Sequence, residues 1–222
     1  MNPSSYRRGL FSYGFGALEI YETLTLEDVR HAADLFRPVY DASNGRDGFV
    51  SLEVSPHLAY DTEKTITEAK RLWAALDRSN VMIKVPATRE GLPAITQLIA
   101  AGVNINVTLL FGVARYREVV EAYTAGLQHR AAQGKPLNHI ASVASFFLSR
   151  IDVLVDKLLD KLNQADADAS AHPLRGQTAV ACARLAYQYY LEWVESSCWQ
   201  ALSEKGAQTQ RLLWASTGTK KD

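Results

Sequence analysis

The sequence lacks several features that would assign it to common classes of protein. It has only 2 cysteines in 222 residues, and its 24 Lys and Arg balance its 24 Asp and Glu. A nucleic-acid-binding protein normally has a basic excess, so this balance argues against nucleic acid as the main partner. No apolar run approaches the roughly 18 residues of a membrane span. The first residues also lack the apolar stretch of a secretory signal. We therefore expect no membrane partner.

The few cysteines and histidines predict a reducing environment and no metal. Cys182 and Cys198 fall in residues 178–205, a stretch with the apolar period of one long helix. Their separation corresponds to about 24 Å of helical rise, which no disulfide bridges. A cytoplasmic location follows as the default. The 5 histidines show no metal-ligand spacing, and we expect no cofactor.

Apolar residues repeat with two periods that alternate along the chain. The two-residue period of strands predicts strands at residues 48–54, 81–87, 104–110, 139–147 and 211–217. The three-to-four-residue period of helices predicts helices at residues 18–36 (ended by Pro38), 62–78, 92–101, 114–133, 151–162 and 178–205. This alternation, with short connections, indicates parallel βα units, and residues 163–175 form an extended loop between two of them.

The predicted strands are apolar on one face and partly polar on the other. In the third strand, Ile105, Val107 and Leu109 share one face, opposite Asn106. Strands of a flat sheet covered on both faces are usually apolar throughout. A barrel instead has helices outside and polar side chains inside, at one end. Five strands do not close a barrel of eight. We therefore predict an α/β fold, an incomplete (β/α)8 TIM barrel with about five of eight strands and the helices outside, as one domain over residues 1–222.

One lysine stands in an apolar strand. Lys84 lies two residues before Pro86 at the end of its strand, which places its amine in the mouth of the predicted barrel. Partial desolvation disfavours an ammonium group and makes the amine nucleophilic toward a carbonyl carbon. Glu53 occupies the matching position on the preceding strand, where a buried carboxylate needs a partner. A simple ion pair between the two residues is the alternative to a catalytic pair.

Five segments carry a family resemblance. They are EVSP at residues 53–56, IKVPAT at 83–88, NINVTLLF at 104–111, ASFFLSR at 144–150 and WASTGTK at 214–220. Together and in this order they resemble the transaldolases, and more narrowly the longer bacterial ones, including those fused to glucose-6-phosphate isomerase. The likeness runs over nearly the whole chain but not over the family's full length. We expect barrel strands to be missing at both ends.

The resemblance implies a Schiff-base mechanism without a metal. Lys84 would attack the C2 carbonyl of sedoheptulose 7-phosphate or fructose 6-phosphate, and the iminium would permit cleavage of the C3–C4 bond. The retained dihydroxyacetone unit would pass to glyceraldehyde 3-phosphate or erythrose 4-phosphate, in the pentose phosphate pathway. Glu53, with a water held by Thr108, would move protons.

The resemblance also implies which residues bind the sugar phosphates. Two asparagines match residues that bind substrate hydroxyls, and four residues match the phosphate site: Asn2 and Asn106 for the hydroxyls, and Ser145, Arg150, Ser216 and Lys220 for the phosphate. A charge-assisted contact between arginine and phosphate suits that role. Judged without the resemblance, the polar residues of these strands are ordinary side chains lining a barrel.

One family residue has no match. In transaldolases an aspartate on the first strand deprotonates the C4 hydroxyl, and loss of a general base lowers the rate by roughly 10²–10⁴-fold. Two unpaired sheet edges would also favour self-association into a homo-oligomer. Three interpretations stay open: a transaldolase, an inactive or partner-dependent transaldolase fragment, and a Schiff-base aldolase that releases free dihydroxyacetone.

Overall fold

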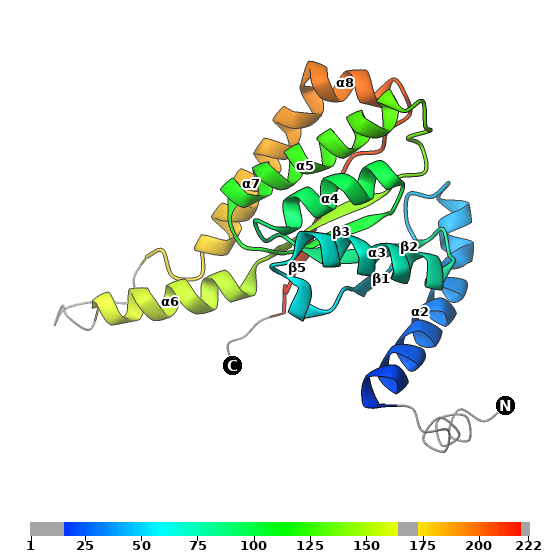
Figure 1. Ribbon diagram of the computed structural model, residues 1–222. Helices are drawn as coiled ribbons and strands as arrows, with labels where there is room; N and C mark the ends of the chain where they lie inside the picture. Colours follow the sequence, from blue (N-terminus) through cyan, green and yellow to red (C-terminus); the bar gives the residue numbers. More distant parts are fainter. Residues whose placement is uncertain (1–15, 164–172, 219–222) are drawn as a thin grey trace.

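Five parallel strands form one sheet, and their order in the sheet is their order in the chain (Figure 1). The structure is a computed structural model that describes residues 16–163 and 173–218. Its strands are β1 (Val50–Glu53), β2 (Val81–Pro86), β3 (Ile105–Leu110), β4 (Ser142–Phe147) and β5 (Arg211–Ala215). A doubly wound sheet reverses its strand order at one point, whereas a consecutive order is that of a barrel. The predicted parallel α/β fold is confirmed. In the described residues β1 and β5 are edge strands, so the barrel is not closed.

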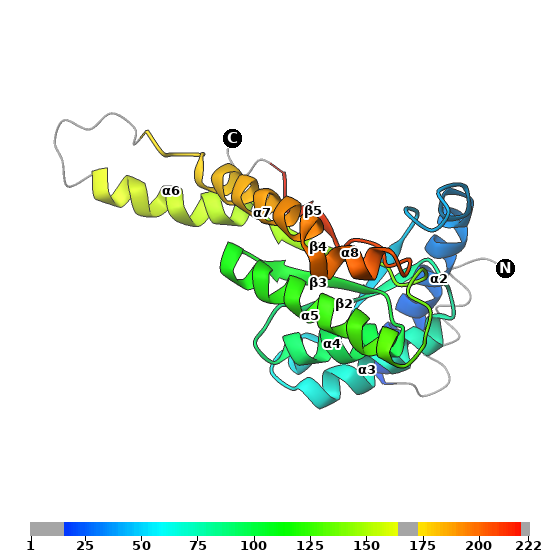
Figure 2. The same cartoon turned by 90° about the horizontal axis from the view of Figure 1, so that it is seen from above.

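The helices lie outside the sheet, as predicted. They are α2 (Ala17–Ala42), the 3-10 turn η1 (Pro56–Leu58), α3 (Thr62–Leu76), α4 (Gly91–Ala101), α5 (Val113–Ala132), α6 (Ser149–Asn163), α7 (Thr178–Glu195) and α8 (Ser197–Ser203). Figure 2 shows α3, α4 and α5 side by side along one face of the sheet. None of the helices in the described residues combines the length and the apolar character that crossing a bilayer requires.

The helix-facing side of the sheet is an apolar core. Ile83 and Val85 on β2 and Val107 on β3 are fully buried there, together with side chains of α4 and α5. Helix α5 approaches α4 closely because Gly126 has no side chain: a Cβ atom there would lie 2.7 Å from the Cβ of Ile99. We call this side the convex face and the opposite side the concave face. The packing of the convex face fixes the strands on which the candidate site is built.

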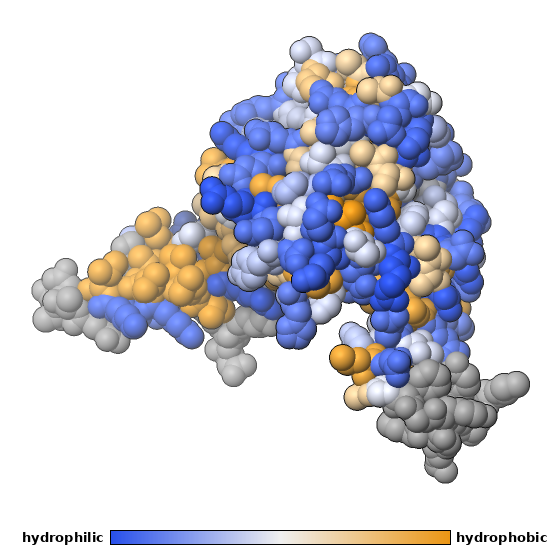
Figure 3. All heavy atoms as spheres, in the orientation of Figure 1, coloured by the Kyte–Doolittle hydropathy of each residue, from blue (hydrophilic) through white to orange (hydrophobic). Residues whose placement is uncertain are grey.

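Helix α6 is covered far less than α3 to α5. It projects from the sheet in Figures 1 and 2, and Figure 3 shows apolar surface along it. Leu154, Leu158 and Leu162 are all exposed. Their four-residue spacing places them on one side of the helix, so α6 presents an apolar stripe outside the core.

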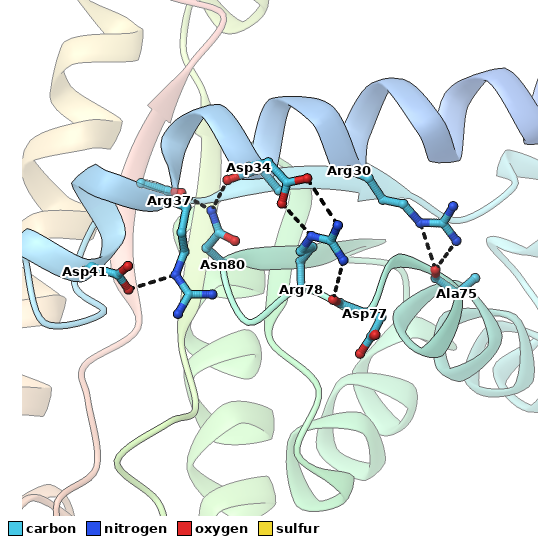
Figure 4. Close-up of polar contacts among 10 residues, drawn as sticks. Arg30, Asp34, Arg37, Asp41, Ala75, Asp77, Arg78 and Asn80 are labelled. Atoms are coloured by element: carbon cyan, nitrogen blue, oxygen red, sulfur yellow. Dashed lines mark hydrogen bonds and ion pairs between the residues drawn. The ribbon is translucent and has the colours of Figure 1, made fainter.

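Pro38 does not end α2, contrary to the prediction. The helix continues to Ala42, with Pro38 inside its C-terminal part. A proline removes one helical hydrogen bond, but side chains of the loop before β2 hold this part of the helix (Figure 4). The buried Asn80 donates through Nδ2 to the Ala33 carbonyl at 2.7 Å, and the Arg78 guanidinium binds the Asp34 carboxylate at 2.6 Å. These contacts hold the turn that precedes Pro38, and the ion pair between Arg37 and Asp41 at 2.8 Å spans the proline itself.

The long helix predicted at residues 178–205 is also wrong, because it is two helices. Ser196, in an extended conformation, separates α7 from α8. Its hydroxyl donates to the Trp193 carbonyl at 2.6 Å and accepts from the Trp199 amide at 3.2 Å. One serine thus ends the first helix and caps the second, a role that its short polar side chain favours. Of the predicted loop at 163–175, residues 164–172 lie outside the described residues.

Candidate active site

Lys84 lies on the concave face of β2, beside Glu53. The parallel register of β1 and β2 pairs the two residues directly, and the Lys84 Nζ is 3.1 Å from the Glu53 Oε2. The Lys84 side chain is 27% exposed, so it is partly buried while a solute can still reach it. The Glu53 side chain is more exposed than predicted because β1 is an edge strand of the described sheet. The predicted pair is present, and it satisfies both the ion-pair and the catalytic interpretation.

The next strand places Asn106 and Thr108 alongside Lys84. The register of β2 and β3 pairs Lys84 with Asn106 and Pro86 with Thr108. Both polar residues are buried, on the face opposite Val107. Residues from three neighbouring strands therefore meet on the concave face, where Glu53 ends β1 and Lys84 and Thr108 each lie two residues before the end of their strands. The carboxyl end of the strands is the end of a barrel at which active sites lie.

A bulge follows Thr108, and the sequence did not reveal it. Leu109 was predicted on the apolar face, but it is exposed and has a φ of 60°, in the left-handed region. The register with β4 shifts at this point, so Leu110, not Leu109, returns to the core. An extra residue in a strand re-aims the side chains around it. Here the extra residue turns Leu110 into the core, while Thr108 stays on the concave face that alternation with Asn106 gives it.

Within the candidate site, the Ser145 side chain contacts Asn106. Its Oγ donates to the Asn106 Oδ1 at 2.7 Å, and the Asn106 Nδ2 donates to the Ser51 Oγ at 3.1 Å. The resemblance placed Ser145 with the phosphate residues, but its hydroxyl here faces the asparagine beside Lys84. Ser51 was not among the predicted site residues. The signal was present, because Ser51 shares the concave face of β1 with Glu53.

Arg150 and Ser216 lie at the start of α6. The Arg150 guanidinium carbon is 5.1 Å from the centre of the Phe147 ring, and the Ser216 Oγ is 2.9 Å from the Ser149 Oγ. The Ser149 amide also donates to the Ser216 carbonyl at 2.9 Å. An exposed arginine at a helix N-terminus, next to serine hydroxyls, suits an anion.

Two predicted residues, Asn2 and Lys220, lie outside the described residues. Among the residues that are described, no cluster of three or more His, Cys, Asp or Glu side chains could hold a metal ion. The described part of the candidate site therefore consists of the following residues: Glu53, Lys84, Thr108, Asn106 with Ser51 and Ser145, and Arg150 and Ser216 at the start of α6.

A cavity on the other side of β1 is distinct from this site. It has a volume of about 670 Å³ and lies between α2, the end of β1 and α3. Its lining is mainly apolar and includes Leu52 and Leu72, and Glu53 is the one candidate residue that borders it. The charged groups around the cavity include the carboxylates of Glu22 and Glu68, which repel a phosphate, whereas the concave face ends near the Arg150 guanidinium.

The fold and the site define a class: a parallel βα-repeat protein of barrel type, with a lysine-centred site at the carboxyl ends of its strands. A sequence model described as "Transaldolase/Fructose-6-phosphate aldolase" matches residues 13–222. The chain therefore belongs to the transaldolase/fructose-6-phosphate aldolase family.

Individual relatives agree with the family assignment. The chain is 51% identical to Transaldolase 2 of a Nostoc species, over 93% of this chain and 56% of the relative. It is 53% identical to the transaldolase of Thermobifida fusca, over 96% and 57%. It is 55% identical to Transaldolase 1 of Streptomyces avermitilis, over 91% and 52%. The chain thus spans about half the length of the curated relatives it matches.

Proposed function

We propose that this chain carries the Schiff-base centre of a transaldolase. The observation that supports the proposal is the partly buried Lys84 side chain, whose amine lies 3.1 Å from the Glu53 carboxylate and whose strand position pairs with Asn106. An amine that attacks a carbonyl must lose its proton and then expel water from the carbinolamine, and a carboxylate at hydrogen-bonding distance serves both proton transfers.

The proposed reaction begins with attack of the Lys84 Nζ on C2 of a ketose phosphate. Loss of water gives an iminium, and Glu53 returns the proton that makes water the leaving group. The Glu53 carboxylate, ionised again once water has left, then takes the C4 hydroxyl proton; the C3–C4 bond breaks, and its electron pair forms an enamine on Lys84. With fructose 6-phosphate the released aldose is glyceraldehyde 3-phosphate. The enamine next attacks a second aldose phosphate, such as erythrose 4-phosphate, and hydrolysis frees Lys84.

Substrate binding divides between two groups of residues. Asn106 and Ser145 lie next to Lys84 and are suited to the hydroxyl groups of the three-carbon unit. Arg150 and Ser216 at the start of α6 are suited to the phosphate. We also propose a cytoplasmic location, where sugar phosphates occur. Self-association through the edge strands β1 and β5 is a further part of the proposal, which sedimentation velocity tests.

Reductive trapping tests the proposal. Folded, soluble protein is mixed with fructose 6-phosphate and sodium borohydride, digested and examined by mass spectrometry. We expect the reduced three-carbon unit on the peptide that contains Lys84, and unmodified lysines elsewhere, which serve as the internal control. Folded protein that yields no adduct on Lys84 would overturn the proposal and support the inactive or partner-dependent interpretation.

A second candidate function is aldol cleavage with release of free dihydroxyacetone. It is favoured by the family description, which names fructose-6-phosphate aldolase beside transaldolase. Both reactions share the Lys84 adduct and differ in the acceptor of the enamine. Adding erythrose 4-phosphate separates them: a transaldolase forms sedoheptulose 7-phosphate, whereas an aldolase continues to release dihydroxyacetone.

A further inference from the structure

The side chain of Asn106 is held from both sides on the concave face. Its Nδ2 donates to the Ser51 Oγ on β1, and its Oδ1 accepts from the Ser145 Oγ on β4. Ser145 already has a place in the proposed site, but Ser51 has none. Since Ser51 contacts a residue that lies directly beside Lys84, its contribution can be argued from this hydrogen bond.

The hydrogen bond between Ser51 and Asn106 passes over strand β2. Ser51 is paired with Met82 and Asn106 with Lys84, so the two bonded residues come from strands that are not neighbours. In a barrel, inward side chains of alternate strands meet in layers. The curvature of this sheet thus links β1 to β3 across β2, at the level between Met82 and Lys84.

The two serines define the plane of the Asn106 amide. An asparagine amide offers two N–H donors and an oxygen with two lone pairs. Among the hydrogen bonds of the described residues, Ser51 takes one N–H and Ser145 one lone pair. The other N–H and the other lone pair are then aimed by those two bonds. Asn106 is only 7% exposed, so it has little freedom to reorient once both bonds are made.

We propose that Ser51 is a positioning residue for the Lys84 centre. This inference rests on the proposed function. Ser51 holds the Asn106 amide in the orientation in which it binds a hydroxyl group of the three-carbon unit on Lys84. It acts through Asn106 and takes no part in the proton transfers, which belong to Glu53.

The first test compares Ser51→Ala with Ser142→Ala. Ser142 is a buried serine on the convex side of β4, where its Oγ donates to the Ile105 carbonyl at 2.7 Å. We expect Ser51→Ala to slow maximal trapping of fructose 6-phosphate on Lys84 by about ten- to hundred-fold, because misplacement of a binding group by about 1 Å has an effect of that size. Ser142→Ala should leave the trapping rate within about twofold while lowering the unfolding midpoint. Ser51→Thr, which retains a hydroxyl, should recover most of the rate.

A double-mutant cycle with Asn106→Ala separates positioning from a general structural role. If Ser51 acts through Asn106, Ser51→Ala should cause no further loss in the Asn106→Ala background, so the effects are non-additive. The inference is overturned if the two losses of trapping rate multiply in the double variant. It is also overturned if Ser51→Ala traps as fast as the unaltered chain.

Nuclear magnetic resonance keeps the inference testable if trapping fails altogether. The side-chain amide protons of Asn106 are assigned by their loss in Asn106→Ala. In Ser51→Ala we expect them to shift and to exchange with water faster, whereas Ser142→Ala leaves them in place. If the Asn106 amide signals are unchanged in Ser51→Ala, the inference is wrong. Shifted signals together with no Lys84 adduct in the unaltered chain would instead sink the proposed function and retain the link between Ser51 and Asn106.

Discussion

The two faces of the sheet differ in composition: the convex face is apolar and buried, and the concave face carries polar and charged side chains. Alternate residues of the same strands contribute to the two faces. On the convex face, Ile83 and Val85 are completely buried against helices. On the concave face, Lys84 between them reaches Glu53, with a quarter of its surface exposed. The first face stabilises the fold, and the second contains the groups that can do chemistry. Because a strand turns successive side chains to opposite faces, one residue of displacement exchanges these roles.

The largest effect should come from removing the amine. Lys84→Met keeps a chain of similar length but cannot form an imine, so we expect complete loss of the trapped adduct. The variant should remain folded, because Lys84 lies outside the convex core and its partner Glu53 is half exposed. Mass spectrometry after borohydride treatment measures the first expectation and circular dichroism the second. An adduct of equal yield on another lysine would break the assignment of chemistry to this face.

The next largest effect should come from Glu53→Gln. An amide cannot transfer the protons of imine formation, and loss of a general acid–base group slows a reaction by roughly 10²–10⁴-fold. The rate of adduct formation measures this directly. Glu63→Gln is the matched control, since Glu63 is an exposed glutamate in the first turn of α3. If Glu53→Gln traps as fast as the control, the Glu53–Lys84 contact is only an ion pair.

On the convex face, Ile83→Ala should reduce stability without changing the chemistry of Lys84. Deleting a fully buried isoleucine to alanine lowers the free energy of unfolding by about 2–5 kcal/mol. Urea denaturation measures the change. The trapping rate of the fraction that remains folded should match that of the unaltered chain. A folded variant that traps tenfold more slowly would show that the two faces are not independent.

A smaller loss of stability is expected at the contact between α4 and α5. Gly126→Ala places a methyl group 2.7 Å from the Ile99 Cβ, which forces the helices apart. Overpacking of this kind destabilises by about 1–3 kcal/mol, although alanine improves helix propensity by about 1 kcal/mol relative to glycine. Gly126→Ala combined with Ile99→Gly, which removes the Cβ and Cγ2 atoms that the new methyl group would meet, tests the cause. The double variant should be more stable than the sum of the single changes predicts.

Much of the concave site was predictable from the strand pattern. Parallel βα units place the carboxyl ends of consecutive strands side by side, and that geometry brings Glu53, Lys84 and Asn106 together in the register observed. Local alternation is enough for such residues because each pair lies on neighbouring strands.

Features that depend on distant contacts or on local strain were not predictable. Leu109 adopts a left-handed conformation without a glycine to signal it. Ser51 meets Asn106 only because the sheet curves across β2. Pro38 stays inside α2, whose preceding turn is held by Asn80, far along the chain. In each case the contact or backbone conformation that decides the structure leaves no trace in the spacing of apolar residues nearby in the sequence.

The smallest effect should come from the charged surface outside both faces. The hydrogen bond from the Arg71 guanidinium holds the pKa of the Glu68 carboxyl below its usual range, against a smaller opposing effect of burial. A carboxyl whose pKa is lower in the folded state stabilises the fold above its unfolded pKa of about 4.3. That contribution is lost as the pH falls through the folded pKa.

Glu68→Gln should therefore destabilise the chain by at most about 1 kcal/mol at neutral pH, because the pair is partly exposed. The difference between the two chains should shrink as the pH falls through the folded pKa, as urea denaturation at neutral and at acidic pH would measure. A difference that persists in acid would mean that Glu68 contributes by packing between α2 and α3 and not by its charge.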